Sequence, residues 1–227
     1  MRYCGTVPAG GLVQLGLLEQ EPGGQLRMVF FEPDEASRVA AELLAMPEVV
    51  VAVGAPLRPP ASRRLCDELL LGRGVGPRPF DPALGGTAAE LGTLGVFAPQ
   101  SSDPEGPVPE GSFRQARVFE TNPDGCFCAL GGRRLPARRH PQGIRLRIEE
   151  LERQGVLDDG GGLWNRRIEE IDAAAAGLCA HRYAGGDASW LGVAGEGVLV
   201  LPGATLPGKF STDGVLTPVE RLELPRV

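Results

Sequence analysis

The chain has 227 residues, of which 42% are hydrophobic, with 23 basic residues against 29 acidic ones for a net charge of −6. This composition predicts a globular protein with a sizeable core, and the acidic balance argues against a dedicated nucleic-acid coat protein, which would be strongly basic. No apolar run is long enough to span a membrane and no signal-peptide core follows Met1, so we expect a cytoplasmic protein without a membrane partner.

The first part of the chain reads as β-rich. A short strand is expected around residues 2–6, followed by two apolar segments at 12–18 and 26–31. Residues 21–24 (EPGG) separate these two segments and form a strong turn signal, so the pair predicts a β-hairpin.

A helix is expected next, over residues 35–46, because apolar residues recur there at i, i+3 and i+4 before Pro47. Residues 49–53 (VVVAV) are then continuously apolar and too few for a helix, which is typical of a strand buried on both faces. An antiparallel hairpin, a helix and a buried strand together predict a mixed sheet with a crossover.

Residues 72–112 differ from their surroundings, with 9 glycines and 7 prolines in 41 positions. We expect a surface insertion there, with one short helix at 88–94 and little burial over 98–107. The rest of the chain completes one domain with a weakly patterned tail after residue 202. Its expected elements are a strand at 117–120, helices at 141–154 and 165–184, and extended pieces at 190–193 and 197–201.

The helix at 165–184 carries the first candidate site residue. Asp172 lies on the same arc as Ile168 and Ala175, which is the arc expected to face the core, while Glu169 lies at its edge. The opposite position, Glu170, is expected in solvent. A core-facing carboxylate must be paired, hydrogen-bonded or metal-bound, so Asp172 is either a functional carboxylate or the partner of an arginine or a backbone group.

A second candidate, Glu120, stands at the carboxyl end of its expected strand, where sites gather in open α/β sheets. Glu120 and Asp172 are therefore expected to converge. The basic run that follows, residues 133–140 (RRLPARRH), suits phosphate through bidentate contacts, although such runs are also common as plain solvated surface. The candidate substrate-binding residues are Arg133, Arg134, Arg138 and Arg139.

Several strings, in this order along the chain, resemble the domain-of-unknown-function 429 family of predicted RNase H-like nucleases. They are residues 51–57 (VAVGAPL), 64–67 (RLCD), 118–124 (VFETNPD), 143–147 (GIRLR), Glu169 with Asp172-Ala173, and Glu196-Gly197. The resemblance implies an RNase H-like α/β fold, in which a central mixed sheet with antiparallel first strands is flanked by helices. It also implies clustered carboxylates that hold Mg²⁺ or Mn²⁺, here Glu120 and Asp172, with Glu169 as a third catalytic residue.

The chain departs from the family pattern at acidic positions. The pattern has an aspartate early on the first strand, where this chain reads Gly5-Thr6-Val7-Pro8, and another at the position of Gly54. Near the last helix it often has two adjacent acids, where this chain has Ile168-Glu169. Because a site that lacks anionic ligands attracts Mg²⁺ weakly, we expect metal binding to be weak or absent.

Two functions from different classes follow. The first is a catalytically eroded RNase H-like scaffold kept as a binding or assembly module, with nucleic acid or another phosphate-bearing ligand as its partner, or a second copy in a homodimer. The alternative is an active metal-dependent phosphodiester hydrolase that uses Glu120, Asp172 and Glu169. If Gly54 leaves a gap filled by apolar side chains or by residues 72–112, the module is favoured. A metal shared by Glu120 and Asp172 favours the enzyme.

Overall fold

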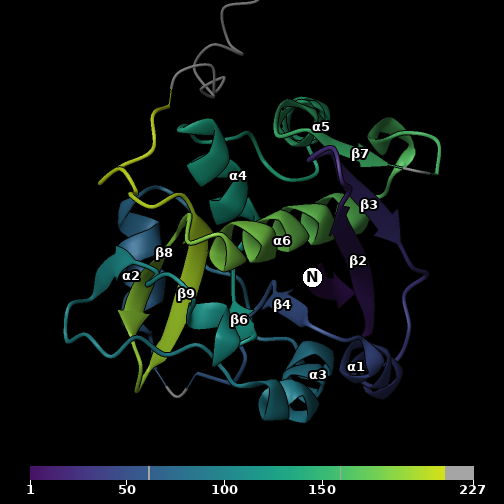
Figure 1. Ribbon diagram of the computed structural model, residues 1–227. Coiled ribbons are helices and arrows are strands. Elements are labelled where there is room, and N and C mark those ends of the chain that lie inside the picture. Colours follow the sequence, from purple (N-terminus) through teal and green to yellow (C-terminus); the bar gives the residue numbers. More distant parts are fainter. Residues whose placement is uncertain (61, 159, 213–227) are drawn as a thin grey trace, which may run out of the picture.

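A computed structural model describes residues 1–60, 62–158 and 160–212. Within them, one nine-stranded mixed sheet forms the centre of the molecule, in the order β5-β8-β9-β6-β4-β1-β2-β3-β7, with helices on both of its faces (Figure 1). The strands are β1 (Arg2–Ala9), β2 (Leu12–Gln20), β3 (Leu26–Phe30), β4 (Val49–Val53), β5 (Glu105–Pro107), β6 (Val118–Glu120), β7 (Val156–Asp158), β8 (Ala188–Val193) and β9 (Gly197–Pro202). The α-helices are α1 (Ala36–Ala45), α2 (Leu65–Gly72), α3 (Pro82–Glu90), α4 (Pro123–Gly131), α5 (Pro141–Arg153) and α6 (Ile168–Ala184).

The strand pairing confirms the expected fold class. β1, β2 and β3 pair antiparallel in chain order, and β4 then returns through the α1 crossover to pair parallel with β1. β6 pairs parallel with β4 and extends the sheet on that side. This is the RNase H-like α/β arrangement, with antiparallel first strands and helices on both faces.

The two faces of the sheet bury separate cores. One core lies against α6 and includes Met28, Phe119 and Leu178, and the other lies beneath α1 and α3 and includes Val51 and Val118. Because successive side chains of a strand point to opposite faces, the neighbours Val118 and Phe119 belong to different cores. The next side chain of β6, that of Glu120, therefore points to the α3 side of the sheet.

Helix α6 lies directly on β1 (Figure 1). Its slim face of alanines, 173–176, and Gly177 let the two backbones approach closely. At Gly5 of β1, a Cβ atom would lie 2.0 Å from the carbonyl oxygen of Ala173 and 2.4 Å from the amide nitrogen of Gly177. The helix and the strand are therefore in close backbone contact, and position 5 accepts glycine alone.

The insertion at 72–112 holds more regular structure than its composition suggests. The helix predicted at 88–94 begins earlier, at Pro82, because the Asp81 side chain caps it by accepting hydrogen bonds from the amides of Ala83 and Leu84. A 3₁₀ turn, Leu91–Leu94, follows it. Residues 100–107 are mostly exposed, as expected.

Two short helices were missed. α2 and α4 span eight and nine residues, too few for an apolar period to stand out. α4 begins at the Asn122-Pro123 pair, with the Asn122 side chain as its N-cap.

The predicted tail after residue 202 is described as far as residue 212, where Phe210 is buried in the main core, and residues 213–227 lie outside the described part. None of the helices in the described ranges is long and apolar enough to cross a membrane.

Candidate functional site

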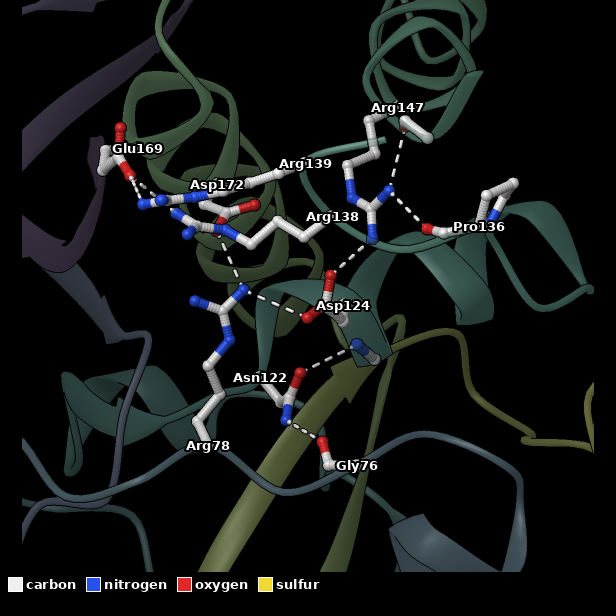
Figure 2. A network of polar contacts seen from close by, with 12 residues as sticks. Gly76, Arg78, Asn122, Asp124, Pro136, Arg138, Arg139, Arg147, Glu169 and Asp172 are labelled. Carbon is white, nitrogen blue, oxygen red and sulfur yellow. Dashed lines mark hydrogen bonds and ion pairs between the residues drawn. The ribbon is translucent and has the colours of Figure 1, made fainter. Parts of the chain in front are cut away.

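Asp172 lies fully buried near the start of α6, and it is neutralised by two arginines from distant parts of the chain (Figure 2). Its Oδ2 atom accepts hydrogen bonds from Arg78 Nη2 at 2.8 Å and from Arg138 Nε at 2.6 Å. Its Oδ1 atom is buried and has no hydrogen-bond partner among the described residues. Of the two interpretations left open for Asp172, the structure shows the one in which the carboxylate is paired with arginine.

Helix α4 brings a second carboxylate to this cluster. Asn122, at its N-cap, accepts a hydrogen bond from the Gly125 amide and donates one to the Gly76 carbonyl, which fixes the helix start against the 72–112 segment. Asp124 in the first turn then accepts from Arg78 Nη2 at 3.2 Å and from Arg147 Nη2 at 2.6 Å. Arg78 thus bridges Asp124 and Asp172 (Figure 2).

Glu169 forms the outer side of the cluster. Its Oε1 atom accepts from Arg138 Nη2 at 3.3 Å and lies 3.5 Å from Arg139 Nη2, and the Arg139 side chain is 79% exposed. The buried Arg147 also donates to the carbonyls of Pro136 and Gly143, which ties α5 to the segment before it. The cluster therefore combines Asp124, Glu169 and Asp172 with Arg78, Arg138, Arg139 and Arg147, for a net charge of +1.

The pKa values follow from burial and from these arginines. Burial raises the pKa of Asp172, and the positive charges of Arg78 and Arg138 act against that rise. Burial alone would also raise the pKa of Asp124, but the charges of Arg78 and Arg147 outweigh it and hold that pKa below its ordinary value of 3.8.

The lowered pKa of Asp124 predicts a contribution to acid sensitivity. Below pH 3.8 the unfolded chain takes up a proton at Asp124 before the folded protein does, so folding stability falls as the pH falls through this range. We expect the Asp124→Asn variant to lose stability less steeply with acidification than the parent protein does. Urea unfolding between pH 5 and the acid limit of folding measures this slope, and Glu42→Gln, at an exposed position of α1, is the control that should keep the parent slope. Parallel curves for Asp124→Asn and the parent would contradict the prediction.

Glu120 does not join this cluster. Its side chain is 3% exposed and forms a two-point ion pair with Arg64, through Nη1 to Oε2 at 2.8 Å and Nη2 to Oε1 at 2.7 Å. The Leu57 amide also donates to its Oε2 atom. The expected convergence with Asp172 is wrong: the two carboxylates share no hydrogen-bond partner, and Glu120 points to the α3 side whereas Asp172 belongs to the helix on the other face.

The space beside Gly54 is filled by apolar side chains. A Cβ atom on Gly54 would lie 2.7 Å from Val7 Cγ1 and 3.1 Å from Pro123 Cγ. The 72–112 segment enters the Asp172 cluster through Arg78. The apolar filling beside Gly54 is the feature that was expected of a binding module.

The remaining predicted residues and the missed ones can be placed from their contacts. Arg138 and Arg139 reach the cluster. The Arg134 side chain instead packs over Gly74, and the backbone of Arg133 forms a β-bridge with Ser211.

The prediction for Glu170 is wrong. Its side chain is buried and bonded to Arg166 and Arg167, because α6 is enclosed on nearly all sides. Arg78 had no sequence signal, since its partner Asp172 is 94 positions away.

Comparisons with known proteins agree with the resemblance seen in the sequence. The sequence model of a family described as "Protein of unknown function (DUF429)" matches residues 102–195, a part that contains Glu120, Glu169 and Asp172. No curated protein matches the sequence. Among solved structures, Thermus thermophilus RuvC is similar at 17% identity with a TM-score of 0.41, over 82% of this chain and 96% of that one.

Proposed function

We propose that this protein is an RNase H-like scaffold that has lost nuclease activity and acts as a binding module. The observation that carries the proposal is the pairing of Asp172 with Arg78 and Arg138. A guanidinium group supplies the positive charge that a buried carboxylate needs, so two arginines here take the place that a divalent cation would have beside a catalytic aspartate.

The donor groups present do not fit the metal pair that the family resemblance implies. Mg²⁺ requires near-octahedral oxygen ligands, and a two-metal site needs several carboxylates around one cavity. Among the described residues no group of three or more histidine, cysteine, aspartate or glutamate side chains is placed to hold a metal ion. Asp124 and Glu169, the carboxylates that share arginines with Asp172, are themselves ion-paired.

The binding surface that we propose is the arginine-rich edge next to this cluster. Arg133, Arg134 and Arg139 are exposed, and Arg139 belongs to the cluster, which carries an excess of one positive charge. Exposed guanidinium groups suit phosphate oxygens through paired hydrogen bonds. Nucleic acid or another phosphate-bearing ligand is therefore the partner class proposed.

The alternative, an active metal-dependent nuclease, has one observation in its favour. The Oδ1 atom of Asp172 is buried and without a hydrogen-bond partner in the described ranges, and an additional cation is one way to satisfy it. In that case Asp172 would act with Glu169, because Glu120 lies on the opposite side of the sheet.

Calorimetric titration with Mg²⁺ and with Mn²⁺, together with nuclease assays on single- and double-stranded DNA and RNA, tests the proposal. We expect no saturable binding of either metal up to about 10 mM, a range that covers even weak oxygen-ligand sites, and no metal-dependent cleavage. Asp172→Asn serves as the control that separates cleavage at this site from a contaminating nuclease. Millimolar or tighter metal binding, with turnover that Asp172→Asn abolishes, would establish the alternative.

A further inference from the structure

A separate pocket of about 840 Å³ opens on the α3 side of the sheet, away from the Asp172 cluster. It lies between three parts of the chain: residues 57–60 with Ser62 and Arg64, the helix α3, and the turn that joins β8 to β9. Its volume falls in the range of small-molecule sites, which are mostly apolar with a few converging polar groups. The pocket has this composition.

The walls of the pocket are apolar and its floor is ionic. Ala88, Val96, Phe97 and Val198 line it, and the side chains of Glu120 and Arg64 line it as well, although each is at least nine-tenths buried. A flat apolar body fits walls of this kind. Burying such a body next to an ion pair is favourable only if the ligand brings polar groups that match the pair.

Counting hydrogen bonds shows what the floor still offers. The Arg64 guanidinium has five N–H groups, of which Nε and one of Nη2 bond Asp67 while the other of Nη2 and one of Nη1 bond Glu120. One Nη1 hydrogen is left, beside Gly197 of the pocket wall. Glu120 Oε1 takes a single bond from Arg64, so it can accept another. Among the described residues the floor thus has a free acceptor, Glu120 Oε1, and a free donor at the opposite end of the same ion pair, on Arg64 Nη1.

The charge of the floor favours a ligand that donates. Arg64 is shared by two carboxylates, Glu120 and Asp67, so the triad carries a net charge of −1. An anionic head group would be repelled here, whereas a neutral N–H donor is attracted to Glu120 Oε1. An amino group on the ligand matches the free acceptor position at Glu120 Oε1.

The rim of the pocket carries charges of both signs, because the exposed Glu196 lines it as well as Arg58. Arg58 lines it, is exposed, and makes no ion pair with any residue of the described ranges, and the Ser62 side chain lies nearby on the same rim. An unpaired guanidinium and a hydroxyl group are suited to an anion, phosphate in particular.

We propose that this pocket binds a nucleotide whose base carries an amino group, with the base edge against Glu120 and Arg64 and the phosphate at Arg58. The apolar walls hold the base, the acidic floor selects the amino group, and the unpaired Arg58 on the rim binds the phosphate. The ligand is either a free mononucleotide or the terminal nucleotide of a strand, which present the same chemistry. The inference adds a ligand to the proposed binding role, and it rests on that role only in assuming that the protein binds without cleaving.

Pairs of nucleotides with and without an amino group on the base test the floor. Calorimetric titration in metal-free buffer compares GMP with IMP, and CMP with UMP. We expect GMP and CMP to bind about tenfold more tightly than their partners, because a donor that meets a buried carboxylate is worth roughly one decade of affinity. Guanosine, without its phosphate, should bind roughly threefold more weakly than GMP, and Arg58→Gln should remove that difference.

A tetranucleotide that ends in a 5′-phosphorylated guanosine distinguishes a free nucleotide from the end of a strand. Tighter binding than that of GMP indicates a strand end, and weaker binding indicates a free nucleotide.

Filling the pocket tests its location without disturbing the core. Ala89 lines the pocket at an exposed position of α3, so Ala89→Trp should abolish saturable binding while leaving the fold intact. Ala41→Trp, at an exposed position of α1 outside the pocket, is the matched control and should bind nucleotide as the parent protein does.

Three results would each overturn the inference: no nucleotide binding, equal binding of GMP and IMP, or unchanged binding by Ala89→Trp. Since none of these titrations contains metal, the result is independent of whether nuclease turnover is found.

Discussion

Replacing Gly5 with alanine is expected to destabilise the protein by about 4 kcal/mol or more, or to prevent folding altogether. The added methyl group would lie 2.0 Å from the Ala173 carbonyl oxygen and 2.4 Å from the Gly177 amide nitrogen. Both atoms belong to the α6 backbone, so no side-chain rotation relieves the contact. The whole helix must move away from β1, and the apolar contacts that it makes with β1, β2 and β4 must loosen.

Urea unfolding measures this effect, and two other glycines calibrate it. Gly16→Ala would place its Cβ atom 3.3 Å from the Met28 Sδ, which can rotate away, and 3.3 Å from the Ala173 Cβ, which is relieved by a shift of a few tenths of an ångström, so a loss of about 1–2 kcal/mol is expected. Gly23→Ala, in the β2–β3 turn with no atom within 4 Å, should change stability by less than about 0.5 kcal/mol. If all three variants were equally stable, close approach of α6 would not be what requires glycine at position 5.

The Gly5 contact also bears on function. The family pattern has an aspartate in this part of the first strand, and no side chain fits at position 5 while α6 keeps its place. Position 54 is similarly closed by Val7 and Pro123. Restoring carboxylates at Gly5 or Gly54 would therefore require the helices around the site to move, in addition to changing two residues.

How far the sequence predicted this structure depended on the range of the interactions involved. α6 and the first four strands were found because a long apolar period, or a buried apolar run, is a local signal. Asp172 was identified as a buried carboxylate for the same reason, since its neighbours on the helix place it on the core-facing arc.

The ion pairs were beyond sequence reasoning because each joins residues far apart in the chain. Arg78 lies in a segment interpreted as an exposed insertion, and only the folded chain brings it to Asp172. Glu120 was correctly placed at the carboxyl end of its strand. The face of the sheet to which its side chain points could not be predicted, because the sequence does not show which face α6 covers. A one-residue difference in strand register is enough to move a predicted ligand to the opposite face.

The stability of Asp172 variants distinguishes the proposed binding module from the metal-dependent nuclease without an activity assay. In the structure the fully buried Asp172 compensates the charges of Arg78 and Arg138, whose side chains are 13% and 23% exposed. Removing one partner of a buried ion pair leaves the other uncompensated, which costs roughly 3–5 kcal/mol. Because Arg78 keeps Asp124 and Arg138 keeps Glu169, we expect the lower end of that range, about 3 kcal/mol, for Asp172→Ala in urea unfolding.

Two further variants show whether the loss comes from the charge. Asp172→Asn keeps the volume and removes the charge, so it should destabilise nearly as much as Asp172→Ala does. In a double-mutant cycle, Arg78→Ala combined with Asp172→Ala should cost about 2 kcal/mol less than the sum of the two single changes. Glu42→Ala, at an exposed position of α1, is the control and should be near neutral.

The opposite result would support the nuclease alternative. Carboxylates kept for metal binding repel one another when the metal is absent, so replacing one at a working site is often neutral or stabilising. A gain in stability for Asp172→Asn in metal-free buffer would therefore mean that Asp172 is retained for a cation. A loss of about 3 kcal/mol, with coupling to Arg78, would instead mean that the arginines have replaced the cation and that this carboxylate is now part of the framework of the fold.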